Sequence, residues 1–289
     1  MDIRGFVANS LLEWEDRVAA VVVTGGCNWR CPYCHGWRFV LEPEKLPRID
    51  EDEIIRRLAA QGEWLDGVVI SGGEPTMQPD LPAFIARVRN DLFQNPLVGQ
   101  SGGRAEGFEA SFAANMDTHL GKKDNEEARR LFPRDARWGF ETGRKETGLA
   151  VKLHTNGSRP EVVRPLLDDR LLACLALDYK APLDERLSKA AGRELSAAEI
   201  AAVAESFRLA AGIGEYHTTL CPRFIDFDTF AAMAENLKDG AGLWILQQYG
   251  PDDCLDRDAA GGERYDDAAL ERFLAAARER YNGKVLLRP

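Results

Sequence analysis

The sequence predicts an α/β fold in which parallel strands form a partial (β/α)6 barrel with one large insertion. Six short apolar segments alternate with amphipathic segments along the 289 residues. The apolar segments are nearly continuous in Val, Ile and Leu, as is typical of strands that are covered on both faces. Repeated strand–helix units give parallel strands with right-handed crossovers, and such a sheet curves into a full or partial barrel.

The expected elements follow from the ends of these segments. The expected strands are Ala19–Thr24, Gly67–Ser71, Leu149–Thr155, Cys174–Asp178, Tyr216–Leu220 and Leu243–Gln248. The expected helices are Glu51–Gln61, Leu81–Leu92, Arg159–Asp168, Ala197–Ala211, Asp228–Leu237 and Asp266–Tyr281. Asp50 is a good N-cap for the first helix, and Glu53 occupies the third helical position that a capping box requires.

One segment interrupts the alternation, between the second helix and the third strand. Residues 93–147 contain Gly-Gly pairs, dense charge and no regular period, so we expect a loop-rich insertion. This insertion is either a surface segment without a direct function or a lid over the ligand-binding edge of the sheet. The barrel is then expected to comprise residues 1–92 and 148–250, with residues 251–289 as a C-terminal helical extension.

The composition argues against several classes of protein. A net charge of −10 leaves no excess of Lys and Arg to neutralise phosphates, so general nucleic-acid binding is not expected. The sequence has no run of about 18 apolar residues, so we expect no transmembrane span. Four acidic residues among the first twenty do not suit a signal peptide. We therefore expect a cytoplasmic protein.

Three of the six cysteines lie within eight residues, at Cys27, Cys31 and Cys34. Three thiolates on one short loop can each bind one iron of a cubic iron–sulfur cluster, which leaves the fourth iron with an open position. An open metal position can bind and activate a ligand. The alternative is a structural zinc site with His35 as the fourth ligand, although its adjacency to Cys34 makes this geometry awkward.

Further polar residues follow the expected strands. The segment 71–76 reads Ser-Gly-Gly-Glu-Pro-Thr, where the glycines allow a ligand to approach the backbone and the carboxylate can pair with an ammonium group. Asn156 follows the third strand, and Asp178 and Lys180 lie at the end of the fourth. Because ligands bind at the carboxyl ends of such strands, we expect these residues near the cysteines.

Together, these motifs resemble the radical S-adenosylmethionine (SAM) superfamily, and within it the activating enzymes of glycyl radical enzymes. The best resemblance is to the branch that activates anaerobic ribonucleoside-triphosphate reductase, which is similar to pyruvate formate-lyase activating enzyme. The matching segments are Gly5–Trp14, Cys27–His35, Val68–Asp80, Thr155–Gly157, Ala176–Pro182 and Leu246–Tyr249. The fold implied is the radical SAM type of partial barrel.

The resemblance implies a [4Fe-4S] cluster, held by the three cysteines, and SAM as cofactors. Reductive cleavage of SAM would give a 5'-deoxyadenosyl radical that takes a hydrogen atom from a substrate, here the glycine of a partner glycyl radical enzyme. A flavodoxin- or ferredoxin-type protein would donate the electron under anaerobic conditions. The alternatives are a radical enzyme that modifies a small molecule, nucleoside or peptide, and more remotely a non-catalytic metal-binding module.

The resemblance also implies which residues contact SAM. Tyr33 and the backbone around His35 would contact the adenine. The other contacts would come from three strand ends: Gly72, Gly73 and Glu74 for the methionine amino group, and Asn156, Asp178 and Lys180 for the ribose or the methionine end.

Two histidines depart from the family pattern, and with Lys180 they are the candidate catalytic residues. His154 stands where the family carries an Asp that helps bind a monovalent cation, and a neutral imidazole is a poor ligand for such a cation. A protonated His154 would instead supply positive charge, so we expect the cation site to be lost or rebuilt. His217 stands where the family usually carries Arg, which removes a bidentate fork.

Overall fold

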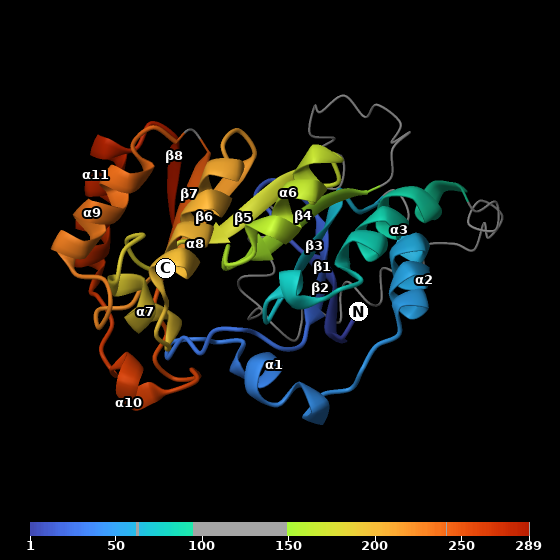
Figure 1. Cartoon of the computed structure of the whole chain (residues 1–289), viewed down its shortest axis with the longest axis horizontal. Helices are drawn as coiled ribbons and strands as arrows, with labels where there is room; N and C mark the ends of the chain where they lie inside the picture. The colour runs from blue at the N-terminus through green and yellow to red at the C-terminus, as the bar shows by residue number, and fades with distance from the viewer. Residues whose placement is uncertain (62–63, 95–148, 241, 289) are drawn as a thin grey trace, which may run out of the picture. The chain divides into compact units, whose positions relative to one another are not determined.

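The computed structural model describes residues 1–61, 64–94, 149–240 and 242–288. These residues contain one eight-stranded sheet, with its strands in chain order (Figure 1). The strands are β1 (Ile3–Ser10), β2 (Ala19–Thr24), β3 (Gly67–Gly72), β4 (Ala150–Thr155), β5 (Cys174–Asp178), β6 (Gly214–Leu220), β7 (Leu243–Gln248) and β8 (Lys284–Arg288). β1 is antiparallel to β2, and each later pair is parallel. Among the described strands β1 and β8 do not pair, so the barrel is unclosed and the predicted fold class is confirmed.

Helices connect the strands, and most of the longer ones pack on the outer face of the curved sheet (Figure 1). The helices are α1 (Trp37–Leu41), α2 (Glu51–Gln61), α3 (Leu81–Gln94), α6 (Pro160–Asp168), α7 (Arg186–Ala191), α8 (Ala197–Leu209), α9 (Phe227–Leu237), α10 (Arg257–Ala260) and α11 (Asp267–Arg280), with the 3-10 turns η1 (Pro43–Lys45) and η3 (Pro75–Met77). All six predicted strands and all six predicted helices are present, close to their predicted ends.

The two edge strands were not predicted from the sequence. β1 is only partly buried, and β8 is short with charged residues at both ends, so neither gives the continuous apolar signal of a central strand. β8 pairs with β7 and thus adds a strand within the C-terminal segment that was expected to be helical. Arg288 at the end of β8 forms a 3.1 Å ion pair with Glu15, which links the two edges of the sheet.

Helix α2 begins as predicted, but its first turn is not a full capping box. The Asp50 carboxylate accepts a 2.9 Å hydrogen bond from the backbone N–H of Asp52. The Glu53 carboxylate instead accepts from Arg56 at 2.7 Å and Arg57 at 2.8 Å. Two arginines within one turn of the same helix therefore compete successfully for the side chain that a capping box would use.

Two hydrophobic clusters cover the two faces of the sheet. The larger one fills the space between the sheet and the helices, and includes Phe84 and Leu177. The smaller one lies on the inner face and contains Trp14, Ala19, Val21, Val69 and Cys174. Gly67 makes room for it, because a Cβ there would lie 2.6 Å from the Trp14 ring. The inner cluster closes the amino end of the barrel and leaves the carboxyl end for a ligand.

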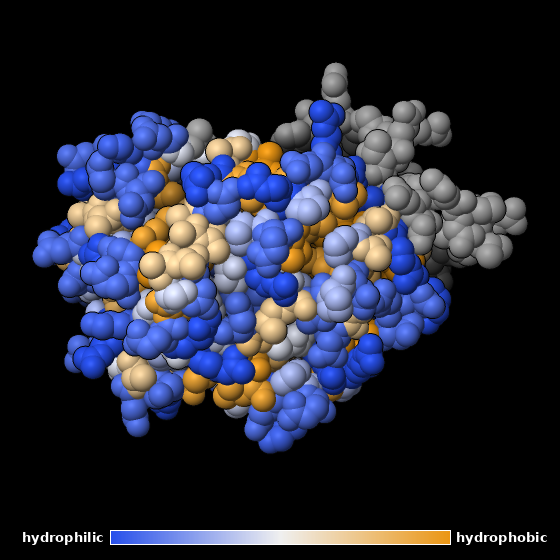
Figure 2. All heavy atoms as spheres, viewed as in Figure 1, coloured by the Kyte–Doolittle hydropathy of each residue, from blue (hydrophilic) through white to orange (hydrophobic). Residues whose placement is uncertain are grey.

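On the face shown in Figure 2, most surface atoms belong to hydrophilic residues, and smaller hydrophobic areas lie between them. Within the described ranges, no helix combines the length and the apolar character needed to cross a bilayer. Almost all of the predicted insertion, residues 93–147, lies outside the described residues, so its role as a lid stays a prediction.

Candidate cofactor site

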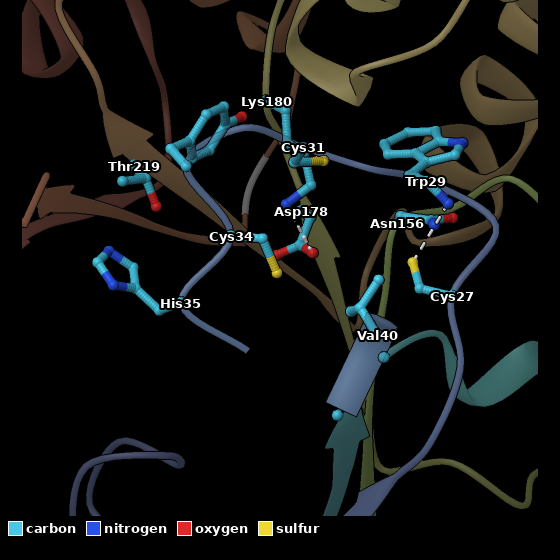
Figure 3. Close-up of a pocket in the computed structure, with 13 residues that line it drawn as sticks. Cys27, Trp29, Cys31, Cys34, His35, Val40, Asn156, Asp178, Lys180 and Thr219 are labelled. Atoms are coloured by element: carbon cyan, nitrogen blue, oxygen red, sulfur yellow. Dashed lines mark hydrogen bonds and ion pairs between the residues drawn. The ribbon is translucent and has the colours of Figure 1, made fainter. Parts of the chain in front are cut away.

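A cavity opens at the carboxyl ends of the parallel strands (Figure 3). It is lined by Cys27, Trp29, Cys31, Tyr33, Cys34, His35, Val40, Gly72, Gly73, Asn156, Asp178, Lys180 and Thr219. Each residue predicted to bind the cluster or SAM lines this cavity, with the exception of Glu74. The candidate catalytic residues His154 and His217 do not line it either.

The cavity also includes three residues that sequence reasoning did not select: Trp29, Val40 and Thr219. Thr219 lies near the carboxyl end of β6, so the rule that placed Asn156 and Asp178 at the site would also have found it. Trp29 lies between Cys27 and Cys31, so its position in the cysteine loop could also have identified it as a residue near the cluster. Val40 belongs to α1 and carries no chemical signal that marks it as a site residue.

The cysteine loop is held by hydrogen bonds within the loop. The Cys34 N–H donates to the Cys31 carbonyl at 3.0 Å, and the Trp29 N–H donates to Cys27 Sγ at 3.3 Å. Burial raises the pKa of the Cys27 thiol to about 11 and that of Cys31 to about 12. The thiols are therefore protonated in the metal-free chain at neutral pH, and binding of a metal would release their protons.

The residues at this cavity fit an iron–sulfur cluster with an open iron. A cubic cluster needs three thiolates on three different irons, so the sulfurs need not converge on one point. In the described part of the chain, no three His, Cys, Asp or Glu side chains converge to hold a single metal ion. Trp29 Nε1 and Tyr33 Oη are buried without a hydrogen-bond partner among the described residues. Since an unmade buried hydrogen bond costs about 1–3 kcal/mol, a bound ligand would satisfy a need that the protein leaves open.

The glycine loop after β3 packs directly on the cysteine loop. Gly72 has φ +121°, in the region that favours glycine. The Gly73 N–H donates to the Thr24 carbonyl at 2.9 Å, and the Glu74 N–H donates to the Gly26 carbonyl at 2.8 Å. A Cβ on Gly73 would lie 1.8 Å from the Gly26 carbonyl oxygen, so no larger residue fits without movement of the backbone beside Cys27.

Gly73→Ala is therefore expected to destabilise the metal-free protein by about 2–3 kcal/mol, the cost of overpacking, and to lower the iron retained after reconstitution. The urea midpoint and the iron content per chain measure the two effects. Gly262→Ala is the matched control, because a Cβ at Gly262 meets nothing within 4 Å. Equal urea midpoints for the two variants would contradict the prediction.

The structure places Glu74 away from the cavity, in a structural role. Its buried carboxylate accepts hydrogen bonds from Thr76 Oγ1 at 2.6 Å, Thr155 Oγ1 at 2.7 Å, the Asn156 N–H at 2.8 Å and the Thr76 N–H at 3.1 Å. Burial raises the pKa of Glu74, while these four bonds oppose the rise. The carboxylate thus ties the end of β3 to the end of β4, and a methionine amino group would have to compete with four donors.

Asn156 connects the hydrogen-bonded ends of β3 and β4 to the cysteine loop. Its side-chain amide donates to Asn28 Oδ1 at 2.9 Å, and the Asn28 amide donates to Ser158 Oγ at 2.8 Å. Asn28 is the residue directly after Cys27. The ends of β3 and β4 and the cysteine loop therefore form one hydrogen-bonded wall of the cavity.

Lys180 supplies positive charge next to the three thiols. Its Nζ lies 3.0 Å from Asp178 Oδ2 and 5.9 Å from the centroid of the Tyr33 ring. Burial alone would lower the pKa of Lys180, but Asp178 holds it well above its usual value. The same charge works against burial to lower the pKa of each cysteine in the loop. A fixed cation here would stabilise thiolates and an anionic cluster.

The two candidate histidines lie together, with their ring centroids 5.0 Å apart. Burial and the neighbouring His217 and Lys152 lower the pKa of His154 well below its usual value. His154 is therefore neutral at neutral pH. The surroundings thus disfavour the protonated His154 that the sequence led us to expect, because that proton would be both desolvated and repelled.

A segment near the C-terminus also holds the cysteine loop. Asp253 accepts hydrogen bonds from Trp37 Nε1 at 2.8 Å and Arg38 at 2.9 Å, and its carbonyl lies 2.9 Å from His35 Nδ1. The Leu255 N–H donates to the Cys34 carbonyl at 3.1 Å. Sequence reasoning missed this contact, because Asp253 and Trp37 are 216 positions apart and share no motif.

Asp253→Ala is expected to loosen the cysteine loop without unfolding the protein. The backbone amide of Leu255 should exchange hydrogen about three- to tenfold faster in the metal-free variant, a modest effect because the lost bonds are exposed. Hydrogen–deuterium exchange by mass spectrometry measures this rate. Asp252→Ala is the control, since the Asp252 side chain is 95% exposed. Unchanged exchange at Leu255 would show that Asp253 does not hold the loop.

The chain matches one family model and is similar to several known proteins. The family model named Radical SAM superfamily matches residues 21–237. A protein of Methanocaldococcus jannaschii named as a candidate glycyl-radical enzyme activating enzyme is 26% identical over 89% of this chain and 83% of its own length. A protein of Methanococcus vannielii named as a GTP 3',8-cyclase candidate is 37% identical over 28% of this chain and 27% of its own length. The solved structure of QueE from Escherichia coli aligns with 99% of this chain and 92% of its own, at a TM-score of 0.46 and 13% identity.

Proposed function

Because the chain belongs to the radical SAM superfamily, we propose that it cleaves SAM reductively and uses the resulting 5'-deoxyadenosyl radical to activate a glycyl radical enzyme. The chain is a radical SAM enzyme, and members of this superfamily use a [4Fe-4S] cluster and SAM. The bound cluster supplies the electron that breaks the sulfonium bond. The similarity to a candidate activating enzyme over 89% of the chain supports the choice of target.

The observation that carries the proposal is the convergence of the cavity-lining residues. Cys27, Cys31 and Cys34 line the cavity together with the half-buried cation Lys180. In our proposal the three thiolates hold the cluster, and Lys180 offsets its negative charge. Trp29 and Tyr33 line the same cavity, and each has a buried polar atom without a hydrogen-bond partner among the described residues.

The strand ends would place SAM in the same cavity. The Gly72–Gly73 backbone lines the cavity and would contact the methionine end. Asn156 and Asp178 line the cavity after β4 and at the end of β5, and would bind the ribose or the methionine end. We further propose that a flavodoxin- or ferredoxin-type protein donates the electron.

Anaerobic reconstitution with iron, sulfide and SAM tests this function. The protein should form 5'-deoxyadenosine when dithionite is added. With a glycyl radical enzyme whose glycine carries deuterium, the label should appear in 5'-deoxyadenosine, and the partner should show a glycyl radical signal in electron paramagnetic resonance. A reconstituted protein that retains iron but forms no 5'-deoxyadenosine would refute the proposal.

A nucleotide is the second candidate substrate. The local similarity to GTP 3',8-cyclase candidates, at 37% identity, favours it over other small molecules. The same assay with GTP in place of the protein partner tests it. Deuterium transfer from labelled GTP, with none from the labelled glycine, would favour this second function.

A further inference from the structure

Arg30 is an exposed cation within the cysteine loop. It lies between Trp29 and Cys31, which both line the cavity, but Arg30 itself does not line it. The Arg30 side chain therefore faces solvent rather than the cavity, although its neighbours in the loop include two of the three candidate iron ligands. The cofactor contacts proposed above do not involve Arg30.

The end of helix α7 fixes the backbone of Arg30. The Arg30 N–H donates to the Ala191 carbonyl at 2.8 Å. Gly192 follows the helix in the left-handed region, with φ +68°, and a Cβ there would lie 1.9 Å from the Arg30 carbonyl oxygen. Only glycine allows this contact without movement of the backbone, so α7 sets the position of Arg30 in the loop.

The Arg30 side chain folds back onto its own loop. One terminal nitrogen, Nη1, donates to the Cys27 carbonyl at 2.6 Å and to the Trp29 carbonyl at 2.8 Å. A terminal guanidinium nitrogen carries two hydrogens, so one nitrogen can make both bonds. An exposed arginine without such bonds would sample many rotamers. Here the two bonds hold the positive charge beside Cys27.

Arg30 differs from Lys180 in the way its charge is balanced. Lys180 Nζ lies 3.0 Å from Asp178 Oδ2, and a dashed line in Figure 3 marks this ion pair. Within the described ranges Arg30 forms no ion pair, and its hydrogen-bond acceptors are the two carbonyl groups. Burial raises the pKa of Cys34, whereas Lys180 and Arg30 both act to lower it. The charge of Arg30 thus reaches a thiol of the loop without a carboxylate partner to offset it.

A cation without a carboxylate partner favours reduction of a nearby cluster. Reduction by one electron adds one negative charge, which a fixed positive charge stabilises. Net charge and solvent exposure around a cluster are among the factors that set its reduction potential. Because the whole chain has a net charge of −10, its average field opposes the added electron. A local cation on the cysteine loop works against this field.

We propose that Arg30 is a positioning residue for the electron-transfer step, which holds the Cys27 end of the loop in place and raises the reduction potential of the bound cluster. The protein donor, or dithionite in its place, loses the one electron that the cluster gains. This inference rests on the proposed function and identifies a residue that controls how readily its first step occurs. Arg30 touches neither SAM nor substrate in this assignment, so its effect should appear in the potential.

A redox titration of the reconstituted full chain, followed by electron paramagnetic resonance in the absence of SAM, tests the assignment. Arg30→Gln keeps a hydrogen-bond donor for the carbonyl groups and removes the charge. At a fixed potential, the ratio of reduced to oxidised cluster should fall about fivefold, the effect of one unit charge a few ångströms away in water, which is about 40 mV for a one-electron couple. Arg30→Lys keeps the charge and should stay within about twofold of the wild-type ratio.

Arg278→Gln is the matched control, because Arg278 is exposed and α11 packs on α9 and β8. It should leave the potential unchanged. The difference between the wild type and Arg30→Gln should shrink in about 1 M salt, because the charge of an exposed side chain is screened. Equal potentials for the wild type and Arg30→Gln would overturn the proposal. If Arg30→Gln does not retain iron, Arg30→Lys decides alone: a wild-type potential supports the role of the charge, and a lowered potential overturns it.

Formation of 5'-deoxyadenosine separates this inference from the proposed function. The potential is measured without SAM and does not depend on its cleavage. If the iron-loaded wild type forms 5'-deoxyadenosine under dithionite but has the same potential as Arg30→Gln, only the role of Arg30 is refuted. An iron-loaded wild type that forms no 5'-deoxyadenosine refutes the proposed function, whatever the potentials show.

Discussion

Replacement of Cys31 by serine is expected to remove the iron–sulfur cluster and to lower SAM cleavage by at least about a hundredfold. Loss of a residue that only orients a metal ligand typically costs 10–100-fold in affinity or activity, so loss of a ligand should cost more. Cys31 is 7% exposed and lies between the other two cysteines of the loop. A serine hydroxyl is a poor substitute, because soft thiolates are the preferred ligands of these clusters.

Iron content, visible absorbance and 5'-deoxyadenosine formation after anaerobic reconstitution measure this loss. Cys174→Ala is the matched control, since Cys174 is equally buried, at 8% exposed, but belongs to the inner hydrophobic cluster. The control should retain the wild-type iron content. If Cys31→Ser kept a full cluster, the assignment of Cys31 as one of its three ligands would be wrong.

Replacement of Lys152 by methionine is expected to destabilise the protein by about 3–5 kcal/mol, the usual cost of removing one partner of a buried ion pair. The Lys152 side chain is fully buried, and its Nζ lies 2.5 Å from Glu215 Oε1 and 2.8 Å from the Glu13 carbonyl oxygen. Without Lys152, the Glu215 carboxylate keeps only His217 as a strong partner, and the Glu13 carbonyl loses its donor. Both losses occur inside the barrel, where water cannot easily replace them.

Urea unfolding of the metal-free protein measures the change, with Lys189→Met on the exposed side of α7 as the control. That control should change the free energy of unfolding by no more than about 0.5 kcal/mol. The double variant Lys152→Met with Glu215→Leu should recover much of the loss, because replacement of both partners by apolar groups is often nearly neutral. A double variant no more stable than Lys152→Met would show that the ion pair is not the origin of the effect.

Local sequence patterns were sufficient to predict the central sheet and most of the cavity. Strand ends at Thr24, Gly72, Thr155 and Asp178 are marked by a change from apolar residues to glycine or polar residues. In a parallel sheet these ends meet at one edge, so the sequence pattern predicted that the residues at the strand ends lie together in one site. The cysteine spacing required no tertiary information at all.

The role of Glu74 could not be predicted in the same way. A carboxylate after two glycines is suited both to a ligand ammonium group and to N–H groups of the protein. Two hydroxyl groups, Thr76 and Thr155, donate to this carboxylate, and one of them comes from a strand separated from Glu74 by the insertion. The contact between Asp253 and Trp37 and the 5.0 Å approach of His154 to His217 likewise depend on the curvature of the whole sheet.

The neighbouring positions of β3 and β4 have a consequence for how the chain folds. Each strand pairs with the next along the chain, so the sheet can grow from either side by the addition of one strand at a time. The connection from β3 to β4 is about 77 residues long, against about 18 from β4 to β5. Closure of the longer loop costs about 1.3 kcal/mol more in chain entropy, which slows that step by roughly ninefold. The junction of β3 and β4 is thus expected to be the last to form during refolding, and a shorter connection should accelerate it.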